Sequence, residues 1–197
     1  MICPVISRMF SHSDLAAPLG ISVPTLSEWL KILEITGQIN LVPPYFENFG
    51  KRLVKSPKLY FGDSGLACHL LGIASAPVLK SSPFVGPLFE GFVASEIIKH
   101  QVGSGRAKEL YFFRDQQGLE VDFVVPAGHH KLLLVEAKAS VSVLPSMAVP
   151  LERLAKAIDR YKVEGFLAHR PSREVAGLKA VRPGIQAGSV GDLLEML

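Results

Sequence analysis

Two short apolar segments in the second half of the chain carry charged side chains that could act together. Asp122 lies within GLEVDFVV, and Glu136 and Lys138 lie within LLLVEAKAS. Burying a charge among apolar residues is costly unless it is paired or used, so these positions indicate either a salt bridge or a site. Two carboxylates brought together repel each other unless a cation lies between them. Their oxygens suit a hard cation such as Mg²⁺ or Mn²⁺, with water completing its shell.

A metal ion held in this way would support phosphodiester hydrolysis, because it polarises a phosphoryl oxygen and helps to generate hydroxide from bound water. Lys138 could position that water or neutralise the developing negative charge. Glu90, one position after apolar Phe89 in an upstream helical segment, could add an outer carboxylate. Taken alone, an aspartate followed after thirteen residues by Glu-x-Lys is a weak motif. A surface ion pair that closes a sheet is the alternative.

The spacing of apolar residues predicts the elements that would position these side chains. We expect helices over residues 86–100 and 147–160, strands over 109–114, 119–126, 131–138 and 163–169, and a short terminal helix over 191–197. Helix, three strands, helix, strand is the order of a layered α/β domain.

Alternation along a strand puts Glu136 and Lys138 on one face. Asp122 and Glu136 stand on strands joined by the polar stretch 127–130. Asp122 reaches the same face only if the connecting loop has an odd length, about three or five residues, or if a bulge intervenes. His129 and His130 are neighbours in this turn, so we expect them to be solvated and not to ligate a metal.

The first half of the chain has a different character. Ser13 and Ser22 could cap two helices that end near Gly20 and Gly37, and residues 39–42 continue as an extended segment. A helix-turn-helix followed by a strand is the outline of a winged-helix domain. The proline- and serine-rich run 75–87 is typical of a linker. We therefore predict a winged-helix domain over residues 1–79 and an α/β domain over 80–197.

Nucleic-acid contacts are not obvious from charge. The net charge of +3 neither requires nor excludes a polyanionic partner. The second predicted helix carries Glu28, Lys31 and Glu34, which does not favour base recognition in a major groove. A basic group just after it could contact phosphate, although a solvated loop is the commoner explanation; it comprises Lys51, Arg52, Lys55 and Lys58.

Several function classes are not expected. Two cysteines cannot build a disulfide framework, and the sequence shows neither a signal peptide nor an apolar stretch long enough to span a bilayer. A soluble, cytoplasmic protein without a membrane partner is therefore predicted. The run Gly62-Asp63-Ser64-Gly65 resembles a catalytic serine turn only superficially, so a serine hydrolase is not expected.

The acid on the second strand and Glu-x-Lys on the third resemble the restriction-endonuclease-like PD-(D/E)XK superfamily. More narrowly, the chain resembles the C-terminal region of a family of bacterial and archaeal AAA-type ATPases over residues 19–168, through KSPKLYFGDSGLACHLLG, GPLFEGFVASEII, LYFFRDQQGLEVDFVV and LLLVEAKAS. The resemblance implies Asp122, Glu136 and the Ala137 carbonyl as metal ligands. It also implies Lys138 as the catalytic lysine and Glu90 as the helix acid.

One departure from that family bears on function. The chain has no G-x-x-x-x-G-K-[ST] phosphate loop, since the fragment Gly50-Lys51-Arg52 lacks the earlier glycine and the hydroxyl residue. ATP binding and hydrolysis are therefore not expected. Two functions remain: a Mg²⁺-dependent nuclease acting on DNA or RNA, and a non-catalytic module that binds DNA or protein partners, or that forms a homo-oligomer.

Overall fold

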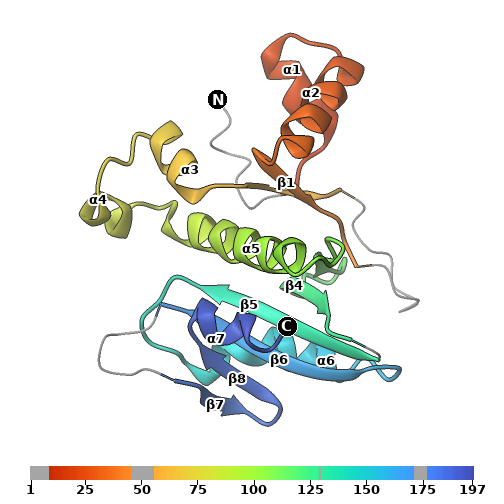
Figure 1. The fold of residues 1–197 in the computed structure, drawn as a ribbon, viewed down its shortest axis with the longest axis vertical. Helices are drawn as coiled ribbons and strands as arrows, with labels where there is room; N and C mark the ends of the chain where they lie inside the picture. Colours follow the sequence, from red (N-terminus) through yellow and green to blue (C-terminus); the bar gives the residue numbers. More distant parts are fainter. Residues whose placement is uncertain (1–8, 46–55, 129, 171–176) are drawn as a thin grey trace. The chain divides into compact units, whose positions relative to one another are not determined.

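The computed structural model describes residues 9–45, 56–128, 130–170 and 177–197 (Figure 1). The chain divides into two compact units. Unit 1 comprises Met1–Pro43 and Lys55–Ser95, and unit 2 comprises Pro44–Val54 and Glu96–Leu197. The predicted helices and strands together form a mixed α/β fold. In the described part of the chain, no helix is long and apolar enough to cross a bilayer.

Unit 1 begins with the two predicted helices, α1 (His12–Leu19) and α2 (Val23–Ile35). Ser22 caps α2 as expected, because its hydroxyl accepts a hydrogen bond from the backbone N–H of Thr25 at 3.2 Å. The predicted cap of α1 was wrong by two residues: Ser11, not Ser13, accepts the bond from an N–H of the first turn. Gly20 ends α1 in the left-handed conformation, as predicted.

Strands β1 (Ile39–Val42) and β2 (Lys58–Phe61) form an antiparallel pair in unit 1. The strand predicted after α2 is thereby confirmed. Helices α1 and α2 and this sheet share a small hydrophobic core, made of Phe10, Ala16, Leu26, Leu30, Ile39 and Leu59.

Three more helices follow β2, and two of them were not predicted. They are α3 (Ser64–Leu70), α4 (Ala76–Ser81) and α5 (Val85–Gly103). Asp63 caps α3 by accepting a bond from the Leu66 N–H at 2.6 Å, so the Gly-Asp-Ser-Gly turn is a helix start. The expectation of an irregular linker over residues 75–87 was wrong, because α4 and the first turn of α5 occupy most of it.

Unit 2 is built on a six-stranded sheet with the order β3-β4-β5-β6-β8-β7. Strands β3, β4 and β5 are antiparallel neighbours, whereas β5, β6 and β8 run parallel. The four predicted strands are present; the terminal hairpin of β7 and β8 was not predicted. The strand bounds are β3 Tyr111–Arg114, β4 Glu120–Pro126, β5 Lys131–Lys138, β6 Lys162–His169, β7 Lys179–Arg182 and β8 Ile185–Gly188.

One face of this sheet packs against a short helical segment formed by η2 (Pro145–Ala148) and α6 (Val149–Ala155). The predicted helix over residues 147–160 was too long. Buried Ile158 continues the apolar spacing of Leu151 and Leu154, but the backbone around it makes turn-type bonds instead of helical ones. Helix α7 (Val190–Leu194) forms the predicted terminal helix and packs on β6 and β8.

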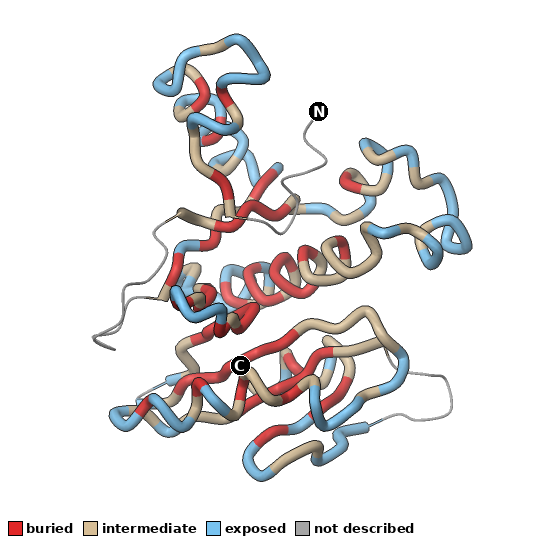
Figure 2. The backbone as a smooth tube through the Cα atoms, turned by 180° about the vertical axis from the view of Figure 1, so that it is seen from behind, coloured by how far each residue is buried: buried red, intermediate tan, exposed pale blue. Residues whose placement is uncertain are grey.

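Burial follows this layering. The middle residues of β4, β5 and β6 are buried, while β7 is exposed or partly exposed along its length (Figure 2). The core on the α6 face includes Val124, Leu132, Leu134 and Leu167. A charged side chain on this face therefore lies beside a dry core and needs a polar environment of its own.

Candidate active site

The β4–β5 hairpin has the register that the candidate residues require. Phe123 pairs with Val135, and side chains alternate along a strand, so the next residues, Asp122 and Glu136, share the other face of the sheet. Lys138 joins them, because it lies two residues beyond Glu136 on the same strand. The convergence expected from the sequence is confirmed within unit 2.

The loop of this hairpin explains the register. The Ala127 N–H donates to the Lys131 carbonyl at 3.0 Å, which leaves three residues, 128–130, between the paired positions. Gly128 and His130 have positive φ values of 86° and 54°, as a loop that reverses a chain so tightly requires. The predicted odd-length loop is confirmed. His130 is exposed and lies near the ring of Tyr161, and His129 lies outside the described residues.

The turn that precedes β4 is fixed by a buried acid. Asp115, 3% exposed, accepts hydrogen bonds from the backbone N–H groups of Gln117 and Leu119, both at 2.9 Å. Such side-chain-to-backbone bonds hold a turn closed. Asp115 therefore fixes where β4 starts and, with it, the position of Asp122.

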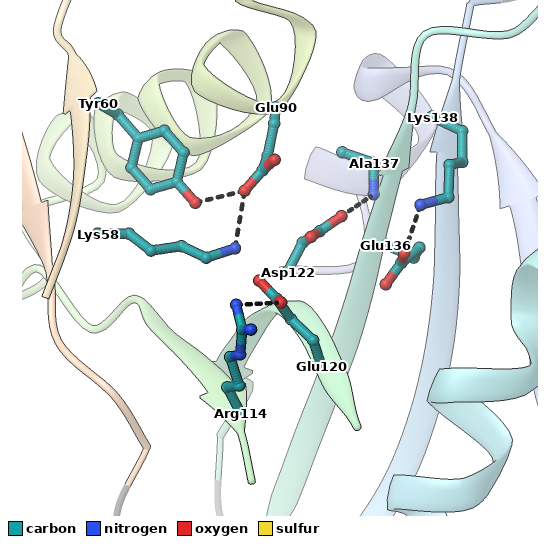
Figure 3. Close-up of polar contacts among 9 residues, drawn as sticks. All are labelled: Lys58, Tyr60, Glu90, Arg114, Glu120, Asp122, Glu136, Ala137 and Lys138. Carbon is teal, nitrogen blue, oxygen red and sulfur yellow. Dashed lines mark hydrogen bonds and ion pairs between the residues drawn. The ribbon is translucent and has the colours of Figure 1, made fainter. Parts of the chain in front are cut away.

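Phe123 and Val135 are the last paired residues of β4 and β5 before Asp122 and Glu136. Beyond them, the Ala137 N–H donates to Oδ2 of Asp122 at 2.9 Å (Figure 3), so this carboxylate takes the place of a backbone acceptor. The N–H and carbonyl of one strand residue face the same neighbour, and the Ala137 carbonyl therefore also faces the β4 side. Lys138 Nζ donates to Oε1 of Glu136 at 2.5 Å.

These side chains line an open pocket of about 450 Å³ in unit 2. Asp122 is 9% and Glu136 6% exposed, so both carboxylates are largely withdrawn from water, whereas the Lys138 side chain is 36% exposed. The walls come from the start of β4, the end of β5 and one side of α6. The remaining lining residues are Gly118, Leu119, Glu120, Val149, Pro150 and Arg153.

The donor set fits a hard divalent cation. Asp122 and Glu136 offer carboxylate oxygens, each of which can accept more than one bond, and the Ala137 carbonyl faces the same side. Oxygen-only ligands completed by water are typical of Mg²⁺. The described residues contain no group of three or more His, Cys, Asp or Glu side chains that could hold a metal. A cation here would therefore depend on two carboxylates, a carbonyl and water.

Glu90, the predicted helix acid, belongs to unit 1, where it stands on α5. Its Oε1 accepts bonds from Lys58 Nζ at 3.0 Å and from the Tyr60 hydroxyl at 2.6 Å (Figure 3). Lys58 is buried in β2, with a side chain only 3% exposed. This burial corrects the expectation that Lys58 contacts phosphate or sits in a solvated loop. The other members of the basic group, Lys51, Arg52 and Lys55, lie outside the described residues.

Sequence reasoning missed two charged residues of the pocket. Glu120 pairs with Arg114 at 3.1 Å across the β3–β4 ladder. Arg153 comes from α6, one residue after Glu152 in a segment whose apolar spacing gave no sign of a site. Glu120 could have been found from the alternation that marks Asp122, because the two share a strand and a face. The catalytic and metal-binding roles of the predicted residues remain predictions.

Comparison with known proteins finds two successive family matches along the chain. Residues 1–76 match a family described as domain of unknown function DUF8612, and residues 85–181 match one described as domain of unknown function DUF4143. Uncharacterised proteins of Mycobacterium bovis and Mycobacterium tuberculosis are each 34% identical to this chain over 118 residues. That region covers 60% of this chain but 26% of each relative, so the chain spans about a quarter of their length. No solved structure gives a significant match.

Proposed function

We propose that unit 2 is a PD-(D/E)XK nuclease-like domain that hydrolyses phosphodiester bonds in DNA or RNA with Mg²⁺ or Mn²⁺. The observation that carries the proposal is the convergence of Asp122, Glu136 and Lys138 on one open pocket. The order α5, β3, β4, β5, α6, β6 also agrees with the helix and strand order of that superfamily.

The residues of the pocket have separate tasks in this proposal. Asp122, Glu136 and the Ala137 carbonyl hold the cation, and the Ala137 N–H fixes the orientation of the Asp122 carboxylate. When bound, the cation supplies Lewis acidity at the phosphoryl oxygen and lowers the pKa of a coordinated water. The Lys138 ammonium, held beside Glu136, neutralises negative charge that develops on the phosphate oxygens. Because the Lys138 side chain is partly exposed, its ammonium group can leave Glu136 and contact a phosphate oxygen of the substrate.

The resemblance to AAA-type ATPases suggests a context for this site, in which the chain corresponds to a region that follows an ATPase domain. The chain's coverage of only about a quarter of its mycobacterial relatives is compatible with that arrangement. No ATPase activity is proposed for the chain itself, because its sequence lacks a phosphate loop.

A second candidate function is a protein-interaction module centred on the helix-turn-helix of unit 1. Helix α2 exposes large apolar side chains on its solvent side: Trp29 at 51%, Ile32 at 58% and Ile35 at 85%. A helix that enters a DNA groove presents polar and basic groups instead. This apolar surface favours protein contact over DNA recognition for unit 1, and it is compatible with catalysis in unit 2.

Calorimetric titration with Mn²⁺ tests the nuclease proposal. We expect the wild-type chain to bind Mn²⁺ and Glu136→Gln to abolish binding, because the variant removes a charged ligand without changing side-chain size. Glu164→Gln is the matched control, since Glu164 pairs with Lys131 and Lys162 on the same sheet outside the pocket. Absence of metal binding by the wild-type chain would contradict the nuclease proposal and leave the interaction module.

A further inference from the structure

The pocket lining includes one positively charged side chain, Arg153, to which the proposed catalytic mechanism assigns no role. Arg153 lines the pocket from α6 and is exposed. Among the described residues, the guanidinium of Arg153 makes no hydrogen bond or ion pair. Its neighbours on the same side of the sheet behave differently. Lys138 is paired with Glu136, and Arg182 and Lys156 are both paired with Glu152.

Glu152 shows why Arg153 remains available. This carboxylate accepts bonds from Lys156 at 2.8 Å and from Arg182 at 2.7 Å. The hydrogen bond and charge of Lys156, together with Arg182, hold the pKa of Glu152 below its usual value. Glu152 is therefore ionised at neutral pH, and its partners are Lys156 and Arg182. The nearest acid in sequence to Arg153 does not neutralise it.

The positive charge of Arg153 suits it to bind a phosphate group of the substrate. The lining residues include two bases, Lys138 and Arg153. Lys138 is paired with Glu136, so the positive charge of Arg153 is the one available to attract a phosphodiester. Arginine is suited to this task, because its planar fork of donors matches two phosphate oxygens at once.

We propose that Arg153 binds a second phosphate of the substrate, next to the one that is cleaved, so that the site acts on oligonucleotide chains in preference to isolated phosphodiesters. The inference rests on the proposed function, which assigns the cleaved phosphate to the β4–β5 side of the pocket. Arg153 lines the pocket from a different element, α6. A volume of about 450 Å³ falls within the range of pockets that hold more than a single small group, roughly 300–1,000 Å³.

Two substrates test the inference in the presence of Mn²⁺. One is a short fluorescein-labelled DNA oligonucleotide, which has neighbouring phosphates, and the other is bis(p-nitrophenyl) phosphate, which has one. We expect Arg153→Ala to raise the KM for the oligonucleotide at least about tenfold, as the loss of a charge-assisted contact implies. Hydrolysis of bis(p-nitrophenyl) phosphate should change by less than about twofold, because no second phosphate is present.

Controls separate the contact from a general charge effect. Lys156→Ala removes an exposed cation from the same helical segment outside the pocket lining, and it should leave both KM values within about twofold. Arg153→Lys keeps the charge but loses the two-pronged geometry, so it should recover only part of the oligonucleotide affinity. Equal effects of Arg153→Ala and Lys156→Ala on the oligonucleotide would overturn the inference.

A binding measurement decides the inference even if no substrate is cleaved. Fluorescence anisotropy of the labelled oligonucleotide should show at least about tenfold weaker binding for Arg153→Ala than for Lys156→Ala. A wild-type chain that binds the oligonucleotide through Arg153 but cleaves neither substrate would contradict the proposed function and support only the phosphate contact of Arg153. Unchanged binding in Arg153→Ala would contradict the inference alone.

Discussion

Units 1 and 2 each bring a carboxylate and a lysine together, and the two pairs differ in their access to water. Lys58 and Glu90 in unit 1 have side chains only 3% and 15% exposed, and Tyr60 donates a further bond to the same carboxylate oxygen. In unit 2, the Glu136 side chain is 8% exposed, but the side chain of its partner Lys138 is 36% exposed and lines a pocket. The same residue types therefore form a closed structural pair in one unit and an accessible cluster in the other.

Burial and opposing charge explain the difference. The Glu90 oxygen has two donors beside it, so its negative charge is well compensated. In unit 2, the β4–β5 pairing puts two carboxylates on one face of the sheet, beside a partly exposed lysine. Two neighbouring carboxylates on an open pocket can share a divalent cation. Residue type identifies a charged cluster, but only its surroundings indicate whether it is structural or chemical.

The largest expected effect comes from breaking the closed pair. Lys58→Ala should lower the free energy of unfolding by about 3 kcal/mol, because removing one partner of a buried ion pair leaves the other charge under-compensated. Urea unfolding followed by circular dichroism measures this loss. The double variant Lys58→Ala with Glu90→Gln should recover part of it. A loss below about 1 kcal/mol would show that the pair is as weak as an exposed one.

A smaller effect of opposite sign is expected in the open cluster. Asp122→Asn keeps an acceptor for the Ala137 N–H but removes one of the two opposing charges. Without metal, it should raise the free energy of unfolding by about 0.5–1 kcal/mol, because like charges directly opposite on a sheet are destabilising by about this amount. The same urea measurement, made in EDTA, checks the sign. A clear loss of stability would mean that the carboxylates are not in repulsion.

A third acid, Glu164, should give the smallest effect, and this effect should depend on pH. Glu164 on β6 pairs with Lys131 at 2.9 Å and with Lys162 at 3.0 Å. The hydrogen bond from Lys131 and then that from Lys162 hold the pKa of Glu164 below its usual value of 4.5. Because the pKa of Glu164 is lower in the folded than in the unfolded state, the ionised group stabilises the fold at pH values above the unfolded-state pKa. This contribution is lost as the pH falls through the folded-state pKa.

Glu164→Gln removes this dependence. The variant should be less stable than the wild type by a few tenths of a kcal/mol at neutral pH, since the pairs are partly exposed. The difference should disappear as pH falls below about 4.5. Thermal unfolding measured across this range tests the prediction. A difference that stays constant with pH would assign the effect to packing instead of charge.

Local pattern predicted the part of the fold that holds the proposed site. Alternation fixed the face shared by Glu136 and Lys138, and the turn residues allowed the odd loop that adds Asp122. The limits of α6 could not be predicted, because Ile158 keeps the helical spacing while the backbone leaves the helix. Strands β7 and β8 were missed because β8 depends on pairing with β6 and β7 depends on pairing with β8.

Contacts between distant residues explain the remaining failures. Lys58 looked like part of an exposed basic group, but its partner Glu90 lies 32 residues away on another element. Arg153 looked like an ordinary polar position on a helix, and only the packing of α6 against the sheet brings it to the pocket. Such pairs depend on tertiary structure, which a local pattern does not encode.

Cleavage of a labelled oligonucleotide, compared between the wild-type chain and Lys138→Ala, is the direct test of a nuclease site in unit 2. We expect the wild-type chain to cleave DNA or RNA in Mn²⁺ and not in EDTA. Lys138→Ala should still bind Mn²⁺, because Asp122, Glu136 and the Ala137 carbonyl remain, but its rate should fall at least about a hundredfold, as is typical when one group that stabilises the transition state is lost. Equal rates for the two chains, or a wild-type chain that binds Mn²⁺ and cleaves neither nucleic acid, would contradict the nuclease proposal.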